Sequence, residues 1–196
     1  MTTATIIRPQ LHHVTLTTTR LQAMIDWYVL TIGLKPLYQF PGGAWLTNDA
    51  ANHRFALLAM PGLGDDPEKQ AHAGLHHHAY EYATLADLLA TYARLKAHGI
   101  LPAMTLDHGM TLSIYYPDPD GNLLELQVDN FGDWAASSQW MATAPQFAAN
   151  PIGIQFNPDK LVEALVAGLD HAEIHRRTNA GEYLPANLAN LAMGQQ

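Results

Sequence analysis

Hydrophobic and polar positions follow two periods along the chain, and their order predicts a supersecondary unit of strands and one helix. The stretch 11–18 is short, β-branched and free of Gly and Pro, which is typical of a strand. Over 21–31 apolar residues recur at intervals of three and four, the spacing of a helix with one buried face, and Gly33 follows where a C-terminal cap belongs. Further strands are predicted at 37–40, 44–47 and 54–60.

The same order of elements begins again near residue 75. A strand over 75–82 leads into helical spacing over 85–95, and this helix is expected to end at His98-Gly99. The interval from strand to helix is the same in both halves, from His13 to Tyr28 and from His77 to Tyr92. Strands are predicted at 103–106, 110–116 and 122–128, the last two joined by the turn 117–121, to which we assign no other role.

These repeats predict an α+β fold in which two βαβββ modules, at about 10–62 and 74–130, pair into one open half-barrel domain over 1–130. Residues 131–196 are patterned more loosely, with strand-like alternation at 152–156 and an Asn-Pro helix start at Asn157. We expect 131–196 to be a partly helical arm that caps the domain or crosses to a partner in a homo-oligomer.

Composition narrows the function classes. Ten Lys and Arg against 18 Asp and Glu give a net charge of -8, which argues against nucleic acid and anionic membranes as partners. The chain has no Cys, so any metal must be held by His, Asp or Glu. The first residues lack the pattern of a signal peptide, and no window is apolar for the length of a membrane span, so the sequence predicts a cytoplasmic protein.

Five of the 11 histidines form two clusters, each at the start of a module's first strand: His12-His13 and His76-His77-His78. Pairing of the modules is expected to bring His13 and His77 together. Glu125 lies in the apolar strand Leu123-Leu124-Glu125-Leu126, where an unpaired carboxylate would cost several kcal/mol without a compensating cation. Two imidazoles and one carboxylate are the facial triad of non-heme Fe(II) oxygenases.

The repeat also supplies a comparison within the chain. Sliding the last strand of the first module onto that of the second puts Ala56 opposite Glu125, so only one module supplies a carboxylate. This disfavours the four-ligand isomerases with two acids and favours a three-ligand site with room for substrate and dioxygen.

These residues resemble the vicinal oxygen chelate superfamily, which includes glyoxalases, bleomycin- and fosfomycin-resistance proteins and extradiol dioxygenases. The resemblance covers about 10–130 and is carried by His13-Val14-Thr15-Leu16, by the strand that follows His77, and by Tyr115-Tyr116-Pro117-Asp118-Pro119-Asp120-Gly121 with the strand ending at Glu125. The spacing is most similar to single-domain extradiol dioxygenases of the catechol and dihydroxybiphenyl type. The resemblance implies that His13, His77 and Glu125 bind Fe(II), with Mn(II) as the other option.

Extradiol cleavage of a catechol or aryl-catechol with O₂ would then be the activity, giving a ring-opened semialdehyde or keto acid. The resemblance implies a base that takes a proton from the diol, and His108 is the candidate. Tyr115 would donate a hydrogen bond to an oxygen of the substrate or of bound O₂. Tyr116 would exchange roles with Tyr115 if the strand register shifted by one residue.

Two other functions remain open at this level: a metal-dependent, non-oxidative enzyme such as a glyoxalase-like lyase or resistance transferase, and a metal-free protein that binds an aromatic ligand. The strand period also turns His12 and His78 to the face opposite the metal ligands, where we expect outward-facing structural histidines.

Overall fold

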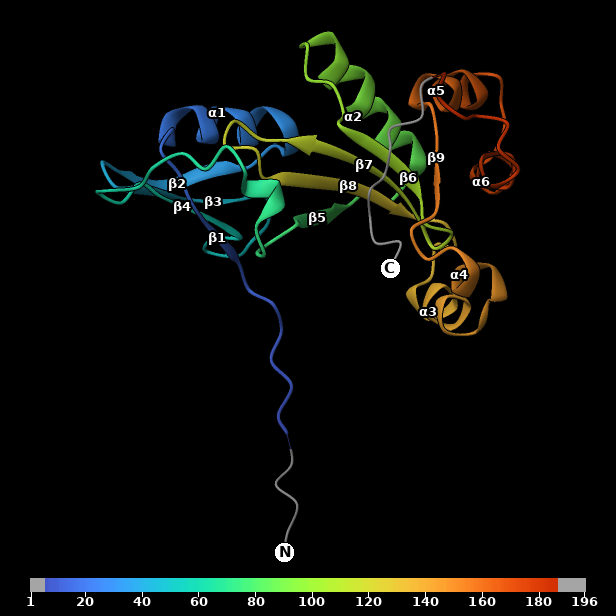
Figure 1. Ribbon diagram of the computed structural model, residues 1–196, viewed down its shortest axis with the longest axis horizontal. Helices are drawn as coiled ribbons and strands as arrows, with labels where there is room; N and C mark the ends of the chain where they lie inside the picture. Colours follow the sequence, from blue (N-terminus) through green and yellow to red (C-terminus); the bar gives the residue numbers. More distant parts are fainter. Residues whose placement is uncertain (1–5, 187–196) are drawn as a thin grey trace, which may run out of the picture. The chain divides into compact units, whose positions relative to one another are not determined.

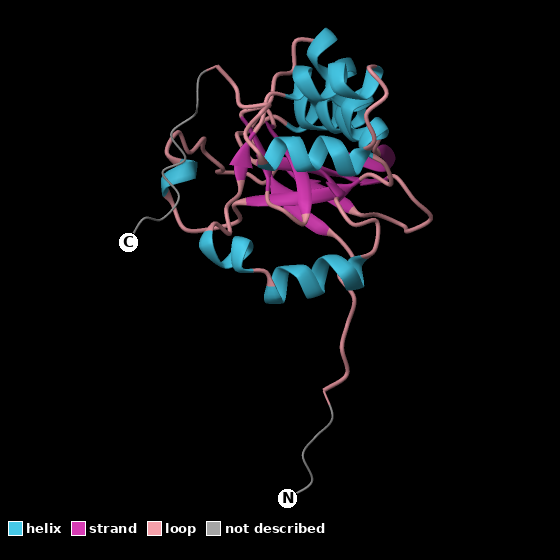
Figure 2. Cartoon of the chain, turned by 90° about the vertical axis from the view of Figure 1, so that its right-hand side faces the viewer, coloured by secondary structure: helices cyan, strands magenta, loops and turns pink. Residues whose placement is uncertain are grey.

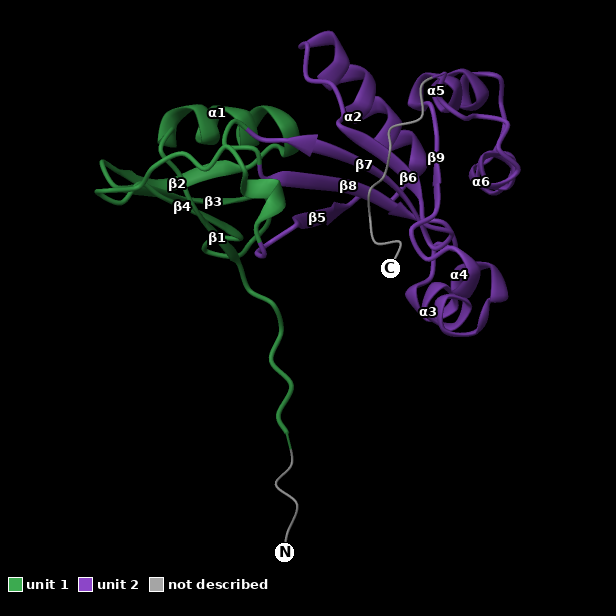
Figure 3. Cartoon of the chain, in the orientation of Figure 1, with its two compact units in different colours: residues 1–72, 119–121 green, residues 73–118, 122–196 purple. Residues whose placement is uncertain are grey.

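A computed structural model of the protein describes residues 6–186, and the chain forms two compact units (Figure 3). Unit 1 takes the chain up to His72 together with residues 119–121. Unit 2 takes residues 73–118 and the chain from 122 onward. The parts of the predicted domain and arm that fall on 1–5 and 187–196 lie outside the described residues.

Unit 1 is built on a four-stranded sheet with one helix (Figure 1). The strands lie in the order β1-β4-β3-β2, with β1 parallel to β4 and the other neighbours antiparallel. The elements are β1 Val14–Thr17, α1 Leu21–Ile32, β2 Lys35–Phe40, β3 Gly43–Thr47, β4 Phe55–Leu58 and a 3₁₀ turn at Lys69–Ala71.

The core of unit 1 follows from the two periods of its sequence. The apolar spacing of α1 places Met24, Ile25 and Tyr28 on one buried face, which packs on the alternate residues of the sheet, including Phe55. Gly33 ends the helix with a φ of 68°, a left-handed conformation that strains other residues. Because side chains alternate along a strand, the residues of the sheet that do not face α1 point to the opposite face of the sheet.

Unit 2 repeats the same order and then extends it. Its sheet has the order β5-β8-β7-β6-β9, with β5 parallel to β8 and the other neighbours antiparallel. Figure 2 shows the helices and strands by type. The elements are β5 His77–Glu81, α2 Leu85–Ala97, β6 Met104–Asp107, β7 Thr111–Pro117, β8 Leu123–Asp129, α3 Trp134–Thr143, α4 Pro145–Ala149, β9 Ile154–Gln155, α5 Pro158–Val166 and α6 His171–Asn179.

The strand register shows how closely the units repeat. In unit 1, Thr15 of β1 is level with Ala56 of β4, and in unit 2, Ala79 of β5 is level with Glu125 of β8. Thr15 and Ala79 each lie two residues beyond a predicted metal-binding histidine, so Ala56 and Glu125 occupy equivalent positions. The predicted α+β class, with two βαβββ modules and open sheets, is confirmed.

The described part of the arm is an integral part of unit 2. Strand β9 pairs with β6 and extends the sheet by one strand, and α5 packs against α2. Asp159, in the first turn of α5, accepts hydrogen bonds from Tyr92 Oη at 2.8 Å and from Lys96 Nζ at 2.7 Å. Among residues 6–186, no helix is both long and apolar enough to cross a membrane.

The arm is more regular than its sequence predicts. The helix expected after Asn157 is present, whereas the strand expected over 152–156 is only Ile154–Gln155. Helices α3, α4 and α6 were not predicted, because α4 is one short turn and the other two lack a continuous apolar stripe. In α3 the buried residue is Ser137, a polar one.

The prediction that His78 faces outward is wrong. Its side chain is only 7% exposed, and the neighbouring Leu124 on β8, with which it is level, is fully buried. Helix α2 packs on this strand, so the face opposite the site is a second core rather than a solvent-facing surface. Burial lowers the pKa of His78 to about 4, which keeps its ring neutral. His12 is exposed, as expected, but its Nδ1 lies 3.0 Å from Nδ1 of His13, so it does not turn to the face opposite that predicted ligand.

A buried carboxylate, Asp107, ties the arm to the end of β6. Its side chain is fully buried, and His175 of α6 lies 2.8 Å from Oδ2. Asn179 donates to the same oxygen at 3.0 Å, and the Gly109 N–H donates to Oδ1 at 2.8 Å. These partners from the arm and from the loop 108–110 satisfy a group that burial would otherwise penalise.

Asp107→Ala is expected to lower the free energy of unfolding by about 3 kcal/mol, because it leaves the buried N–H of Gly109 and the partly buried ring of His175 without their partner. Urea unfolding followed by circular dichroism measures the change. Asp26→Ala, at an exposed position on α1, is the matched control and should stay within about 0.5 kcal/mol of the parent. Equal stability of the two variants would show that the Asp107 contacts contribute little.

Candidate active site

Four of the five predicted site residues form one continuous chain of contacts in unit 2. Neighbouring strands supply three of them: His77 precedes Ala79 by two residues on β5, and Ala79, Glu125 and Tyr115 are level across β5, β8 and β7. Because side chains alternate along a strand, His77, Glu125 and Tyr115 point to the same face of the sheet. His108 follows the end of β6 and reaches the same face.

Glu125 is the centre of this chain. It is 5% exposed, and its Oε2 lies 2.9 Å from His77 Nε2, while its Oε1 accepts a hydrogen bond from Tyr115 Oη at 2.9 Å. Burial opposes its ionisation, but the hydrogen bonds from His77, Ser113 and Tyr115 outweigh burial and hold the pKa of Glu125 below its ordinary value. The carboxylate is therefore ionised.

His77 is bonded through both ring nitrogens. The hydrogen bond to Glu125 raises the pKa of His77 although partial burial opposes this. Its other nitrogen, Nδ1, lies 2.8 Å from Nδ1 of the exposed His76. Nε2 of His77 therefore faces Glu125, and Nδ1 of His77 is held by His76.

Tyr115 joins Glu125 to His108. Its hydroxyl lies 2.8 Å from His108 Nε2 as well as 2.9 Å from the carboxylate, and it has one proton to share between two acceptors. Burial, and next the negative charge of Glu125, raise the pKa of Tyr115, so the phenol is protonated. Tyr116 points to the opposite face, into the core beneath α2, so the register favours Tyr115 for a role in the site.

The arm shapes the loop that carries His108. An added Cβ at Gly109 would come within 2.1 Å of the Trp140 ring, and one at Gly153 within 2.1 Å of the Asp107 carbonyl oxygen. The backbone of Ile152 hydrogen-bonds His108. Burial, the largest effect, lowers the pKa of His108 and favours the neutral imidazole, which can accept a proton.

Sequence reasoning did not find these supporting residues. Ser113, which hydrogen-bonds Glu125, lies two residues before Tyr115 on β7, so the strand period alone could have placed it on the same face. Trp140 is an aromatic residue of the kind that anchors an arm, but neither it nor Ile152 and Gly153 indicates a position beside His108, because that relation exists only after the arm has docked.

His13, the remaining predicted ligand, lies in unit 1 just before β1. There it neighbours His12 and His53, and one ligand atom of each of the three rings lies within 4.8 Å of the others. Trp45 of β3 is level with Ala56, as Tyr115 is level with Glu125 in unit 2. Unit 1 therefore has Trp45 and Ala56 at the positions that the phenol and the carboxylate occupy in unit 2.

The donor set of unit 2 fits a divalent metal ion. Two ligands about 2.1 Å from one ion and at right angles to each other lie about 3 Å apart. The 2.9 Å between His77 Nε2 and Glu125 Oε2 matches this separation. One imidazole and one ionised carboxylate are also ligands that iron and manganese accept.

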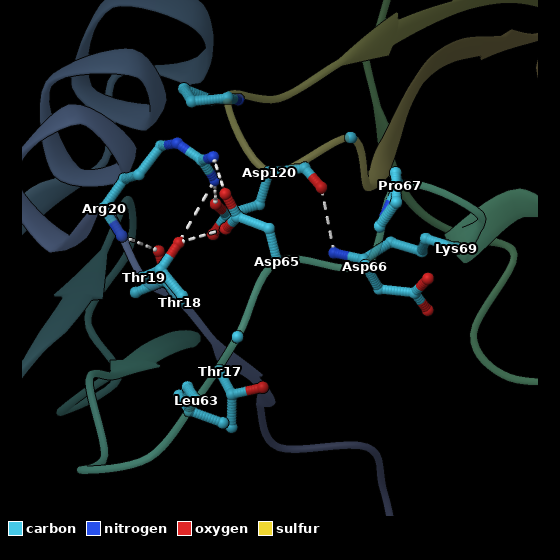
Figure 4. A pocket seen from close by; sticks show the side chains of 13 residues that line it. Thr17, Thr18, Thr19, Arg20, Leu63, Asp65, Asp66, Pro67, Lys69 and Asp120 are labelled. Atoms are coloured by element: carbon cyan, nitrogen blue, oxygen red, sulfur yellow. Dashed lines mark hydrogen bonds and ion pairs between the residues drawn. The ribbon is translucent and has the colours of Figure 1, made fainter.

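Unit 1 also contains a cavity of about 500 Å³, whose lining is mostly polar and charged but includes Leu63 and Pro67 (Figure 4). Two of the carboxylates there share one cation: Arg20 forms an ion pair with Asp65 and another, at 2.6 Å, with Asp120. Lys69 Nζ donates to the carbonyl of Asp120 at 2.9 Å. Residues 119–121 of the turn to which no role was assigned belong to unit 1 and are held there through Asp120. The cavity is a poorer candidate for chemistry than the residues around Glu125.

Comparison with known proteins gives a consistent result. A family model described as the glyoxalase/bleomycin resistance protein/dioxygenase superfamily matches residues 10–126. The chain is 42% identical over 160 residues to biphenyl-2,3-diol 1,2-dioxygenase 2 of Rhodococcus globerulus, covering 82% of this chain and 83% of the relative. It is 40% identical over 171 residues to biphenyl-2,3-diol 1,2-dioxygenase 3 of the same organism, covering 87% and 90%.

Among solved structures, a glyoxylase/bleomycin resistance protein/dioxygenase domain from Frankia sp. EAN1pec superposes with a TM-score of 0.53. The two share 21% identity, and the match covers 63% of this chain and 93% of that structure. This likeness concerns the fold. The family resemblance predicted from the sequence is confirmed.

Proposed function

Because the chain belongs to the glyoxalase/bleomycin resistance protein/dioxygenase superfamily, the vicinal oxygen chelate proteins, we propose that it is an extradiol dioxygenase that cleaves a catechol or aryl-catechol with O₂. The observation that carries the proposal is the continuous contact chain from His77 through Glu125 and Tyr115 to His108. In this chain of contacts His77 and Glu125, the pair that we propose holds the metal, lie next to a phenol and a neutral imidazole. The two relatives named for biphenyl-2,3-diol support the same class of substrate.

The metal in this proposal is Fe(II), with Mn(II) as the alternative. His77 and Glu125 of unit 2 would hold it. His13 is proposed as the third ligand because the family resemblance implies it. When bound, such an ion supplies the one-electron chemistry that lets dioxygen react with an aromatic diol.

The residues around the metal pair handle protons. A diol must lose a proton on binding, and neutral His108 can take it at Nε2, the atom that now lies 2.8 Å from Tyr115 Oη. The single proton of Tyr115 is shared between Glu125 and His108. If Glu125 turns its charge toward a metal, the phenol proton is left for His108 or for a substrate oxygen.

Residues of the arm hold His108, the proposed base, in one position. Trp140 against Gly109 and the Ile152 backbone at the imidazole restrict the movement of His108. Such support matters because a catalytic group must be held within a fraction of an ångström of its working position.

The site residues favour neither a non-oxidative metal enzyme nor a metal-free binding protein. A four-ligand lyase site needs a second acid, and Ala56 stands at the position equivalent to Glu125. A metal-free binding protein has no use for an ionised carboxylate that is buried beside an imidazole. The partners proposed are an aromatic diol and O₂, and assembly into a homo-oligomer stays a prediction.

Anaerobic loading with Fe(II), followed by air and either catechol or biphenyl-2,3-diol, tests the proposal. We expect a yellow ring-opened product to form with consumption of one O₂ per substrate, followed by absorbance and an oxygen electrode. The same protein loaded with Zn(II) is the control and should be inactive. A protein that retains iron but turns over neither diol would contradict the proposal.

A further inference from the structure

Three imidazoles of unit 1 form a cluster that has no counterpart among the described residues of unit 2. His12, His13 and His53 each offer a ligand atom within 4.8 Å of the other two, and none of the three is fully buried. We propose that these three histidines form a second metal site, which takes a zinc ion or another late divalent transition metal and uses His13 in competition with the site proposed above.

The distances within the cluster suit one small ion. Two imidazoles on a tetrahedral zinc ion, each about 2.0 to 2.1 Å from it, have their nitrogens about 3.3 Å apart. Nδ1 of His12 and Nδ1 of His13 are 3.0 Å apart. The His53 ring lies 4.3 Å from the His13 ring and 5.3 Å from the His12 ring, centroid to centroid, so a small side-chain rotation would bring its nitrogen into the same coordination sphere.

A neighbouring residue fixes the orientation of the third ligand. His53 Nδ1 lies 2.8 Å from Asn52 Oδ1. Since an amide oxygen can only accept, Nδ1 carries the proton and Nε2 keeps its lone pair for a metal. Metal-binding histidines are generally held through the other ring nitrogen in this way. Arg54 in turn donates to the His12 carbonyl at 3.1 Å, which fastens the segment before β1 to the start of β4.

The repeat shows that the two units differ in ligands at equivalent positions. By the strand registers within each unit, His53 of unit 1 occupies the position equivalent to Asn122 of unit 2, as Ala56 occupies the position equivalent to Glu125. Asn122 donates to Asp118 instead of approaching His77. Unit 1 thus has a third imidazole and no acid, whereas unit 2 has an acid and no third imidazole.

The donor sets select different metals. Three neutral imidazoles with a water as fourth ligand suit zinc, copper or nickel, whereas a mixed imidazole and carboxylate set suits iron and manganese. The competition rests on the proposed function, in which His13 is also an iron ligand. A zinc ion on His12, His13 and His53 would then remove one of the three iron ligands and act as an inhibitor.

The binding test uses the full chain with His77→Ala and Glu125→Gln, which removes the ligands of unit 2. Zinc affinity is measured by competition with a chromophoric chelator, and the visible spectrum with Co(II) reports a tetrahedral site. We expect one zinc per chain in this background. Asn52→Leu should weaken zinc binding by about 10- to 100-fold, the usual effect of removing a group that orients a ligand, and His53→Ala should weaken it further.

The matched control is His72→Ala in the same background, since His72 is an exposed histidine of unit 1 that contacts Asp66 rather than the cluster. Its zinc affinity should be unchanged. Equal affinity of the His53→Ala and His72→Ala proteins, or no zinc bound in the background itself, would overturn the proposal. Circular dichroism shows whether each variant is folded, and His53→Gln replaces His53→Ala if the latter is not.

The competition is tested in the otherwise unchanged chain. One equivalent of zinc, added before anaerobic iron loading, should lower the iron retained per chain, and His53→Ala should remove this effect. Equal iron loss in both proteins would show that His13 is not shared. Failure to load iron without zinc would contradict the proposed function, while the zinc measurement in the His77→Ala and Glu125→Gln background would still decide the three-histidine site.

Discussion

Glu125→Ala is expected to abolish ring cleavage and to reduce bound iron to a small fraction of one per chain. The change removes the acidic ligand of the proposed metal site and leaves His77 without its partner at 2.9 Å. It also frees the Tyr115 hydroxyl from one of its two acceptors. Iron is measured per chain after anaerobic loading and gel filtration, with circular dichroism to show that the fold is retained.

The control for this prediction is Glu81→Ala, which removes an exposed carboxylate of β5 that accepts from Trp134 in α3. Iron and turnover should be close to those of the parent. His77→Ala and His13→Ala should lose iron as Glu125→Ala does. The His13 variant tests the ligand that is assigned from the family resemblance alone. Full iron occupancy in any of the three would remove that residue from the metal site.

His108→Gln is expected to keep the iron and to lower kcat by about 10² to 10⁴-fold, the usual contribution of a positioned acid or base. The side chain contacts Tyr115 and the Ile152 backbone rather than the metal pair, so its loss should not release the ion. Steady-state kinetics with biphenyl-2,3-diol and an iron assay on the same sample measure both effects.

His98→Gln, at the exposed end of α2, serves as the control and should change neither quantity. If His108→Gln turns over at the parental rate, the base lies elsewhere. If it loses iron, His108 acts on the metal pair instead of the substrate. Tyr115→Phe added to His108→Gln should cost much less than its effect in the parent, because the two side chains act through one shared hydrogen bond.

Much of the fold follows from local periodicity. The β-branched strands and the one-sided helices of both modules appear close to their predicted bounds, because each buries one face against the other. Strand alternation also places His77, Glu125 and Tyr115 on one face, so their proximity could be predicted from the repeat alone. Helices α3 and α6 could not, since each has too few apolar residues at intervals of three and four to mark a buried face in the sequence.

The remaining errors have a common physical cause. His78 lies on the outward side of a strand by alternation, but a helix from the same module covers that side, and periodicity does not show which face of a sheet is covered. The surroundings of His108 depend on Trp140 and Gly153, which lie far along the chain. Long-range packing of this kind leaves a signal only when many sequences are compared.

The two sheets protect their outer strands from pairing with other chains in different ways. In unit 1 the outer strand β2 is exposed along its whole length, but it opens with Lys35-Pro36 and its register is irregular between Pro36 and Tyr38, features that discourage addition of a further strand. In unit 2 the strand β6 has no proline, and β9 covers part of its edge. A chain shortened before β9 would therefore present a bare β6 as a template for intermolecular sheets, so loss of the arm would first appear as aggregation of an otherwise folded module.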